Sequence, residues 1–474
     1  MSSRVQPLVL EAPRTGAHWY EEPLLCFAED HLHADPKVGI PLYGPRSLNT
    51  PRHKSEVHIG FIGTAQAVES SREFYEQCAK GISGEMEHPP FPGCQRDRGF
   101  RCDLHFNPAL VETITRQETQ DISKCRRSRE RLELLLNLCR AKTEILTQKD
   151  HPLDYVVFAI SEDLYRLCRV ANYVDRSKRP VHRDLRRAFK AMAMSFLKPT
   201  QILRETTAGA VVSAGRDLDH PSRIAWNLFT GMYFKVDGLP WGPTGLGPGT
   251  CFVGISFFRP LGSTSTLRTS VVQAFDENGE GLVLRGHNFH WGEERSPHIS
   301  AEMAHSLVEM VLARYHDERK QMPQRVVIHK TSRYEPAERD GIESALARVS
   351  QYDLIALTPV SEIRLSRAGQ YPPLRGTSFD IGLNSFLYTS GYLQLLGKYP
   401  HGHVPSPLQI TDHVGDTGQT QLLRELLVLT KMNWNSANFS GLLPITLRFS
   451  KLVGDILREV PEDQNPQPKY KYYM

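Results

Sequence analysis

The sequence predicts an α/β protein with two α/β units in series. Short apolar, β-branched runs are typical of buried strands, and amphipathic helical stretches separate most of them. A Gly/Pro-rich stretch at 236–249 divides the chain and is expected to be a domain boundary. The 474 residues exceed what one hydrophobic core usually serves, and a hydrophobic content of 40% is enough for packed cores.

The first unit follows an irregular start. Residues 1–55 are rich in Pro and Arg and show little periodicity, so we expect an N-terminal arm or packing segment. The elements expected between this segment and the boundary are a strand at 57–62 and a helix ending near 81, a loop at 85–105, a helix at 116–148, a strand at 155–161, a helix at 182–197, a strand entering at 199–203 and a helix at 223–235.

The second unit begins with strands in meander order. The elements expected there are strands at 250–258, 269–275 and 279–286, a helix at 301–319, a strand at 325–330, a helix at 336–349, a strand at 352–360 and helices at 419–435 and 444–460. Three successive strands followed by helix, strand, helix and strand make a mixed sheet flanked by helices. This order suits an RNase H-like domain.

Composition and charge exclude several classes of protein. No apolar run approaches the roughly 20 residues of a transmembrane helix, and the N-terminus lacks the apolar core of a signal peptide, so we expect a cytoplasmic protein. The eight cysteines include no CxxC pair and are expected to be reduced thiols. A zinc site at Cys94 and Cys102 is the alternative, but common zinc sites do not use this spacing.

Candidate phosphate ligands gather before the boundary. Arg186 and Lys190 stand four residues apart, so they project from one face of the expected helix, and His182 lies one turn earlier. Gln201 follows in the next loop, and Lys235 ends the next helix. Cationic donors beside amide groups suit a phosphate. A solvated basic helix face is the alternative interpretation.

Hydroxyl side chains stand where a nuclease of the RNase H-like fold needs carboxylates. Such an enzyme places acids on the first strand, a later strand and a C-terminal helix, where they hold two divalent metal ions. Here Ser256 ends the motif VGIS, Thr331 ends IHKT and Ser450 ends LRFS. Neutral hydroxyls cannot offset two dications, so we expect no hydrolysis and no metal held by side chains at these positions.

Two polar stretches of the second unit are candidate nucleic-acid contacts. In QRVVIHKTSRYEP, an expected buried strand is followed by a polar cluster that contains Lys330 and Arg333. These two cations suit contact with a phosphate backbone. In LTKMNWNSANF, Asn433 and Asn435 flank Trp434 and could hydrogen-bond or stack on a nucleic acid. A buried tryptophan in a packed loop is the alternative for the second stretch.

These motifs together resemble an Argonaute. HRDLRRAFK, KPTQILRE and NLFTGMYFKVDGLPW are similar to the MID domain, and VGIS, VVIHKTSRYEPAERDGI and LTKMNWNSANFSGLLPITLRFSKLVG are similar to the PIWI domain. The resemblance covers about residues 150–474 and is to the short prokaryotic class. It implies an N-terminal segment at 1–55, a Rossmann-like MID domain at 56–240 and an inactive, RNase H-like PIWI domain at 241–474.

The resemblance assigns roles to the candidate residues. Arg186, Lys190, Gln201 and Lys235 would hold the 5′-phosphate of a guide, with His182 in reserve and a Mg²⁺ ion bridging the phosphate. Arg186 departs from the Tyr or His that the family usually has at this position. The metal positions of active members map to the hydroxyl residues Ser256, Thr331 and Ser450, so the chain should bind and not cut.

The resemblance also implies partners. A guide RNA would find complementary single-stranded DNA of an invader. Target pairing would activate a separate protein in which an APAZ region is fused to a sirtuin-like or TIR effector, and NAD⁺ depletion would then arrest or kill the infected cell. A higher oligomer on activation and the absence of a membrane role belong to the same expectation.

Two other functions are alternatives for this sequence. The first is an active guide-dependent nuclease that uses displaced acids such as Asp380, Glu293 or Asp455. The second is a metabolic α/β enzyme that uses the Gly-rich stretch 242–247, although this stretch lacks the Lys-Ser/Thr of a phosphate-binding P-loop.

Overall fold

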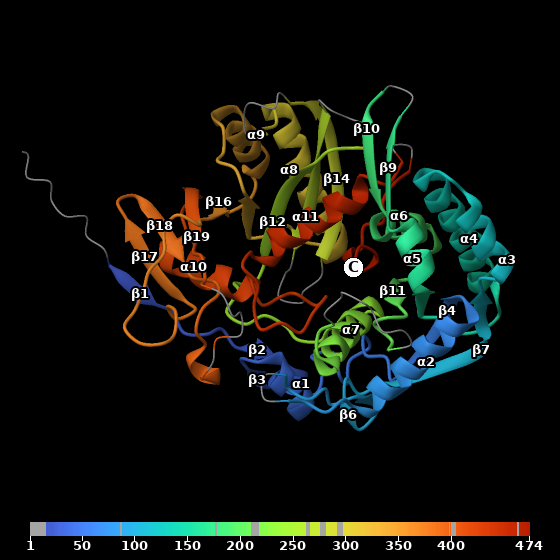
Figure 1. Cartoon of the computed structure of the whole chain (residues 1–474). Coiled ribbons are helices and arrows are strands. Elements are labelled where there is room, and N and C mark those ends of the chain that lie inside the picture. The colour runs from blue at the N-terminus through green and yellow to red at the C-terminus, as the bar shows by residue number, and fades with distance from the viewer. Residues whose placement is uncertain are drawn as a thin grey trace, which may run out of the picture.

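The computed structural model describes residues 16–474 apart from 86–87, 176–177, 210–217, 262–265, 275–280, 292–296, 398, 400–403 and 462–463. The described residues form two α/β units, each with its own sheet, and an N-terminal segment that contacts both (Figure 1). No helix of this described part is long and apolar enough to cross a membrane.

The first unit contains a parallel sheet in the order β11–β8–β4–β7. Its strands are β4 (Glu56–Gly63), β7 (Asp103–Thr113), β8 (Tyr155–Ile160) and β11 (Thr200–Arg204), and its helices are α2 (Ala65–Lys80), α3 (Arg116–Lys124), α4 (Ser128–Gln148), α5 (Glu162–Cys168), α6 (Leu185–Ala193) and α7 (Pro221–Lys235). Alternate residues of β8 pack against α2 and α7 on one face and against α4 and α6 on the other. All of β8 is therefore buried, as its unbroken apolar sequence predicts.

Two predictions for this unit were wrong. The helix expected at 116–148 is two helices, α3 and α4, and the helix expected at 182–197 begins only at Leu185. Residues Pro180–Asp184 instead form β10, which pairs with β9 (Val170–Val174) in an antiparallel ribbon. Asp184 explains the late start of α6, because its carboxylate accepts a hydrogen bond from the backbone N–H of Arg187 and caps the helix there.

The second unit contains a nine-stranded mixed sheet in the order β1–β17–β18–β19–β16–β15–β12–β13–β14. Its strands are β1 (Ala17–Trp19), β12 (Thr250–Phe258), β13 (Thr266–Ala274), β14 (Gly281–His290), β15 (Arg325–Lys330), β16 (Gln351–Pro359), β17 (Thr377–Ile381), β18 (Asn384–Leu387) and β19 (Leu408–Gly415). β12, β15 and β16 run parallel, and the other pairs are antiparallel. The sequence predicted β12 and β15 at these residues but missed β17, β18 and β19.

Helices cover both faces of this sheet (Figure 1). They are α8 (Ala301–Arg319), α9 (Pro336–Leu346), α10 (Gln419–Leu429) and α11 (Ile445–Leu457). Val253 and Ile328 pack toward α8 and α9, whereas Phe252 and Val327 pack toward α10 and α11. The helix expected at 419–435 ends at Leu429.

The N-terminal segment ties the two units together. β1 pairs with β17 of the second sheet, and Cys26 pairs with Gly242 at the junction of the units. Glu22 forms ion pairs with Arg375 and Lys431, both at 2.8 Å. The small elements here and nearby are β2 (Leu25–Cys26), β3 (Leu32–His33), α1 (Pro36–Tyr43), β5 (Cys94–Gln95) and β6 (Arg98–Gly99).

A buried ion-pair network at the start of β15 gives a stability prediction. Arg325 lies 2.7 Å from Asp353 and 2.6 Å from Glu425, and all three are buried. Arg325→Met would leave two buried carboxylates without a cation, so we expect a loss of about 3–5 kcal/mol in the free energy of unfolding, measured by denaturant titration. Arg339→Met, which removes an exposed pair with Glu343, should cost less than about 1 kcal/mol. Equal losses in the two variants would contradict this account of the core.

Candidate nucleic-acid interface

A cavity of about 480 Å³ lies where α6 and α7 meet β11. Three of the predicted phosphate ligands, Arg186, Lys190 and Gln201, line it. The fourth, Lys235, donates a hydrogen bond from Nζ to Gln201 Oε1 at 2.8 Å. The fold thus brings together four side chains from three separate elements, and this cavity is called the phosphate pocket below.

Local structure positions each of these groups. The cap at Asp184 fixes the start of α6, so that Arg186 and Lys190 project one turn apart from the same face. The parallel pairing of β11 with β8 places Thr200 and Gln201 at the start of an ordered strand. α7 ends at Lys235, which puts its ammonium group beside that strand.

The two lysines converge on Thr200. Lys190 Nζ donates to the Thr200 carbonyl oxygen and, at 3.1 Å, to its hydroxyl oxygen. Lys235 Nζ donates to the same carbonyl at 3.2 Å. The residues are only 2% and 1% exposed, so two ammonium groups share neutral acceptors away from water.

This arrangement disfavours the charged form of both lysines. Burial, then the nearby Lys235 and Arg186, lowers the pKa of Lys190 well below its ordinary value. Burial, followed by the charge of Arg186, lowers the pKa of Lys235 to about 7. An anion in the pocket would raise the pKa of both lysines again, because it would bring the negative charge that the protein does not supply there.

The two lysines of the phosphate pocket differ from the other buried cations in having no carboxylate partner among the described residues. Across the described residues, the buried Lys and Arg side chains are Lys190, Lys235, Arg325, Lys330, Arg375 and Lys431. The last four each form an ion pair with a carboxylate, from Asp353, Glu425, Glu338 or Glu22. Lys190 and Lys235 have no such pair within the described part of the chain. Buried cations are otherwise paired because an isolated charge is costly in a protein interior.

Two of the three hydroxyl positions follow a pair of neighbouring strand residues in the second sheet, and the third lies on α11. Gly254 pairs with His329 across the parallel strands β12 and β15. Two residues further along the chain come Ser256 on β12 and Thr331, which directly follows the end of β15. Period-two alternation puts these residues on the face that carries α11, since His329 Nδ1 lies 2.8 Å from the hydroxyl of Thr446. Ser450 lies one helical turn after Thr446, so the two residues project from one face of α11.

The hydroxyls themselves carry no charge. Ser450 Oγ donates to the Leu447 carbonyl at 3.1 Å, while Ser256 Oγ is buried and has no hydrogen-bond partner among the described residues. Burial, reinforced by the charge of Arg325, lowers the pKa of the adjacent His329 to about 3, so this imidazole is uncharged at neutral pH. The described residues contain no group of three or more His, Cys, Asp or Glu side chains that could hold a metal ion.

Solved structures of known proteins share this arrangement of sheets and helices. An Argonaute of Clostridium butyricum, solved with a guide DNA and a 19-mer target DNA, has a TM-score of 0.66 at 14% identity. The chain has an Argonaute-like fold. Aa-Ago with an externally bound siRNA gives a TM-score of 0.58 at 14% identity, and A. aeolicus Argonaute gives 0.55 at 15%.

These matches cover 95%, 96% and 97% of this chain but only 54%, 56% and 55% of the three Argonautes. The chain therefore spans about half the length of the Argonautes it matches. No protein-family model and no curated protein match the sequence. The likeness confirms the predicted α/β architecture with a MID- and PIWI-like fold.

His182 does not join the phosphate pocket. It lies on β10, is exposed, and places Nδ1 at 2.6 Å from the side-chain oxygen of Asn172 on β9. The prediction treated His182 as the first turn of α6, one turn before Arg186. Because the ribbon replaces that turn, His182 projects from a strand and is absent from the residues that line the pocket.

Only one of the two asparagines predicted to contact a nucleic acid from the loop after α10 is available to do so. Asn433 is 5% exposed and donates to Ser436 Oγ at 2.7 Å, so its amide stabilises the loop and is not available to a nucleic acid. Trp434 is fully buried and stacks on Phe234, as the packed-loop alternative anticipated. Asn435 lines the phosphate pocket.

Lys330 is also internal, contrary to the prediction. It is fully buried, pairs with the buried Glu338 and lies 4.8 Å from the centroid of the Tyr334 ring. Strand alternation explains the error, because Lys330 faces away from His329 and toward α9. Arg333, three residues later, is exposed and stays a candidate for contact with a phosphate backbone.

Two of the displaced acids, Asp380 and Asp455, contact side chains other than those of the hydroxyl positions. Asp380 lies on β17, with four strands of the sheet between it and β12, and accepts a hydrogen bond from Gln419 at 3.1 Å. Asp455 pairs with Arg187 at 3.0 Å. Glu293 lies outside the described residues.

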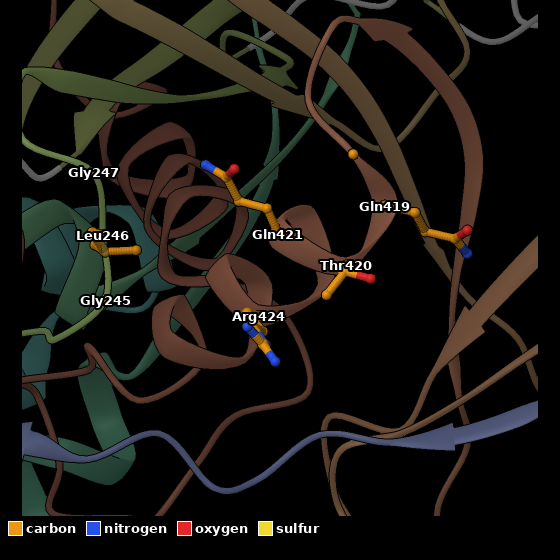
Figure 2. Close-up of a pocket in the computed structure, with 8 residues that line it drawn as sticks. Gly245, Leu246, Gly247, Gln419, Thr420, Gln421 and Arg424 are labelled. Atoms are coloured by element: carbon orange, nitrogen blue, oxygen red, sulfur yellow. The ribbon is translucent and has the colours of Figure 1, made fainter.

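The Gly-rich stretch lines a second cavity, of about 650 Å³. Gly245, Leu246 and Gly247 form one side of it, and the first turn of α10 with Arg424 forms the other (Figure 2). Its lining offers amide groups and one cation but no Lys-Ser/Thr pair. The cavity therefore gives no support to a P-loop enzyme.

The low pKa of Lys235 predicts a pH dependence. A lysine whose pKa is about 7 in the folded protein and about 10.4 in the unfolded chain binds fewer protons when folded, so stability rises with pH in this range. Between pH about 7.5 and about 9.5 we expect Lys235 to contribute up to about 1.4 kcal/mol per pH unit. Lys235→Met should flatten the rise, measured by denaturant titration at each pH, whereas the exposed Lys178→Met should follow the unmodified protein. Parallel profiles for all three proteins would contradict a buried, unpaired Lys235.

Proposed function

We propose that this chain holds the phosphorylated 5′ end of a guide nucleic acid in the phosphate pocket and presents the guide to a complementary strand. The observation that carries the proposal is the pair of buried ammonium groups, Lys190 and Lys235, which lack a carboxylate partner among the described residues. Arg186 adds a third cation at the exposed end of the pocket. A phosphate suits this site because it accepts several charge-assisted hydrogen bonds at once.

A Mg²⁺ ion bridging the phosphate is part of the proposal. The carboxylate side chains that line the pocket are those of Asp184 and Asp219. Mg²⁺ usually takes one or two carboxylates and completes its shell with water and substrate phosphate oxygens. Asp184 and Asp219 fit that pattern and would hold the ion, which would supply further positive charge to the phosphate.

Recognition without hydrolysis follows from the hydroxyl positions. In this proposal Ser256, Thr331 and Ser450 occupy the positions where a two-metal nuclease needs carboxylates. Hydroxyls bring no negative charge to this place, and the neutral His329 adds none. Sequence would then be read by base pairing, and the protein would grip the backbone regardless of sequence.

The wider assignment rests on the resemblance in sequence. The guide would be RNA, the target single-stranded DNA of a plasmid or phage, and the site of action the cytoplasm. A separate APAZ protein with a sirtuin-like or TIR effector would deplete NAD⁺ after target pairing. Co-purification of the chain with such a partner and with short RNA would support this assignment, and purification without any nucleic acid would count against it.

The pocket gives a guide-chemistry prediction. Lys190→Met with Lys235→Met keeps the apolar stems, so the protein should fold, but it removes two charge-assisted contacts worth about 1.5–3 kcal/mol each. We expect affinity for a 5′-phosphorylated guide to fall at least about hundredfold while affinity for the 5′-hydroxyl guide changes little. Fluorescence anisotropy with the two guides measures the difference. Lys124→Met with Lys320→Met, at exposed positions, is the charge-matched control, and equal losses for both guides would place the phosphate elsewhere.

The hydroxyl positions give a cleavage prediction. Guide-loaded protein should leave a labelled complementary target intact in Mg²⁺ or Mn²⁺. Thr331→Asp alone should also be inactive, because Ser256 and Ser450 still bring no charge to the metal positions. Gel analysis of the target decides the matter. Cleavage by the unmodified chain would contradict the proposal and favour displaced acids.

A further inference from the structure

A second group of cations lies outside the phosphate pocket, where the start of α4 meets the ribbon β9–β10. Arg126 and Arg129 are exposed around the first turn of α4, and Lys178 is exposed at the far end of the ribbon. These three residues are called the ribbon patch. Within the described part of the chain, none of them forms an ion pair.

Packing holds the patch together. Ser128 Oγ donates to the carbonyl oxygen of Asn172 on β9 at 3.4 Å, and the guanidinium of Arg129 lies 4.7 Å from the centroid of the Tyr173 ring. The start of α4 is therefore fixed on the ribbon, and Arg129 keeps a defined position relative to β9. Figure 1 shows the ribbon rising beside the second sheet, next to α6 and α11.

The patch is continuous with the phosphate pocket. Arg169, which precedes β9, and Asp184, which ends β10, both line the pocket, so the ribbon grows out of its rim. The backbone N–H of Leu185 on α6 donates to the Arg169 carbonyl at 3.0 Å and fixes this base. A strand rises about 3.3 Å per residue, so Tyr173 lies about 10 Å beyond Val170. Exposed cations thus run outward from the buried lysines, through Arg169, to the ribbon patch.

We propose that the ribbon patch binds the sugar–phosphate backbone of the target strand where that strand continues past the 5′ end of the guide. The inference rests on the proposed function. If the pocket holds the guide's 5′-phosphate, antiparallel pairing brings the 3′ flank of the target out at the pocket, unpaired and negatively charged. Exposed cations without carboxylate partners among the described residues suit a polyanion, and their continuity with the pocket favours a nucleic acid over an acidic protein.

Binding of this kind is insensitive to sequence and sensitive to salt. Contacts to phosphates position a strand and carry no base information. For single strands the slope of log K against log salt concentration changes by about 0.7 per phosphate contact, so loss of three cations should reduce the slope by about 2. This readout separates a backbone contact from a general loss of stability.

The test uses the full chain, with any co-purifying partner, loaded with a 5′-phosphorylated guide RNA. Three DNA targets are compared: one flush with the guide, one extended by about eight unpaired nucleotides past the guide's 5′ end, and one extended equally past its 3′ end. We expect the first extension to tighten binding about tenfold at moderate salt and the second to change it little. Arg126→Ala with Arg129→Ala and Lys178→Ala should abolish the gain and leave the flush target unaffected.

A matched control removes the same charge elsewhere. Arg314→Ala, Arg339→Ala and Arg348→Ala act on α8, α9 and the turn after it, and this variant should keep the gain. The inference is overturned if neither extension tightens binding, if both do so equally, or if the patch variant keeps the gain but loses a co-purifying acidic protein. Failure of the flush target to bind in a guide-dependent way would instead overturn the proposed function, and the inference with it.

Discussion

The convergence of Lys190 and Lys235 on Thr200 is the interaction on which the proposed function depends. Two ammonium groups that share neutral acceptors in a buried site cost free energy unless an anion joins them. The cap at Asp184, the parallel pairing of β11 and the end of α7 together hold this arrangement in place. The first unit thus maintains a site that is electrostatically incomplete without a ligand.

In the second unit, by contrast, the buried cations are paired with carboxylates. Arg325, Lys330, Arg375 and Lys431 all have carboxylate partners, and Glu22 from the N-terminal segment serves two of them. These cations stabilise the packing of the sheet and of the segment that crosses both units. The contrast matters because one physical rule, that buried charges are paired, separates structural cations from those available to a ligand.

The sequence predicted what local patterns determine. β8, β12 and β15 were predicted correctly because an unbroken apolar run is typical of a strand that is covered on both faces. The pocket residues Arg186 and Lys190 were predicted because their spacing places them on one face of a helix. The same reasoning failed where tertiary pairing decides. The end of β10 takes residues 182–184, whose pattern predicted a helix, because they pair with β9. Lys330 turns inward because it pairs with Glu338 on α9, eight residues later. A pattern of polar residues does not show which face of a strand each one takes.

The two cationic regions differ in how they can act on a nucleic acid. Buried cations interact strongly and are little screened by salt, so the phosphate pocket can fix one terminal group in a defined position. Exposed cations such as Arg126 and Lys178 interact weakly and are screened, so they suit a strand whose sequence and length vary. The hydroxyls of Ser256, Thr331 and Ser450 in the second unit carry no charge of their own. In the proposed function the chain would therefore retain a nucleic acid, and its hydroxyls would give no charged ligands to the metal ions that cutting requires.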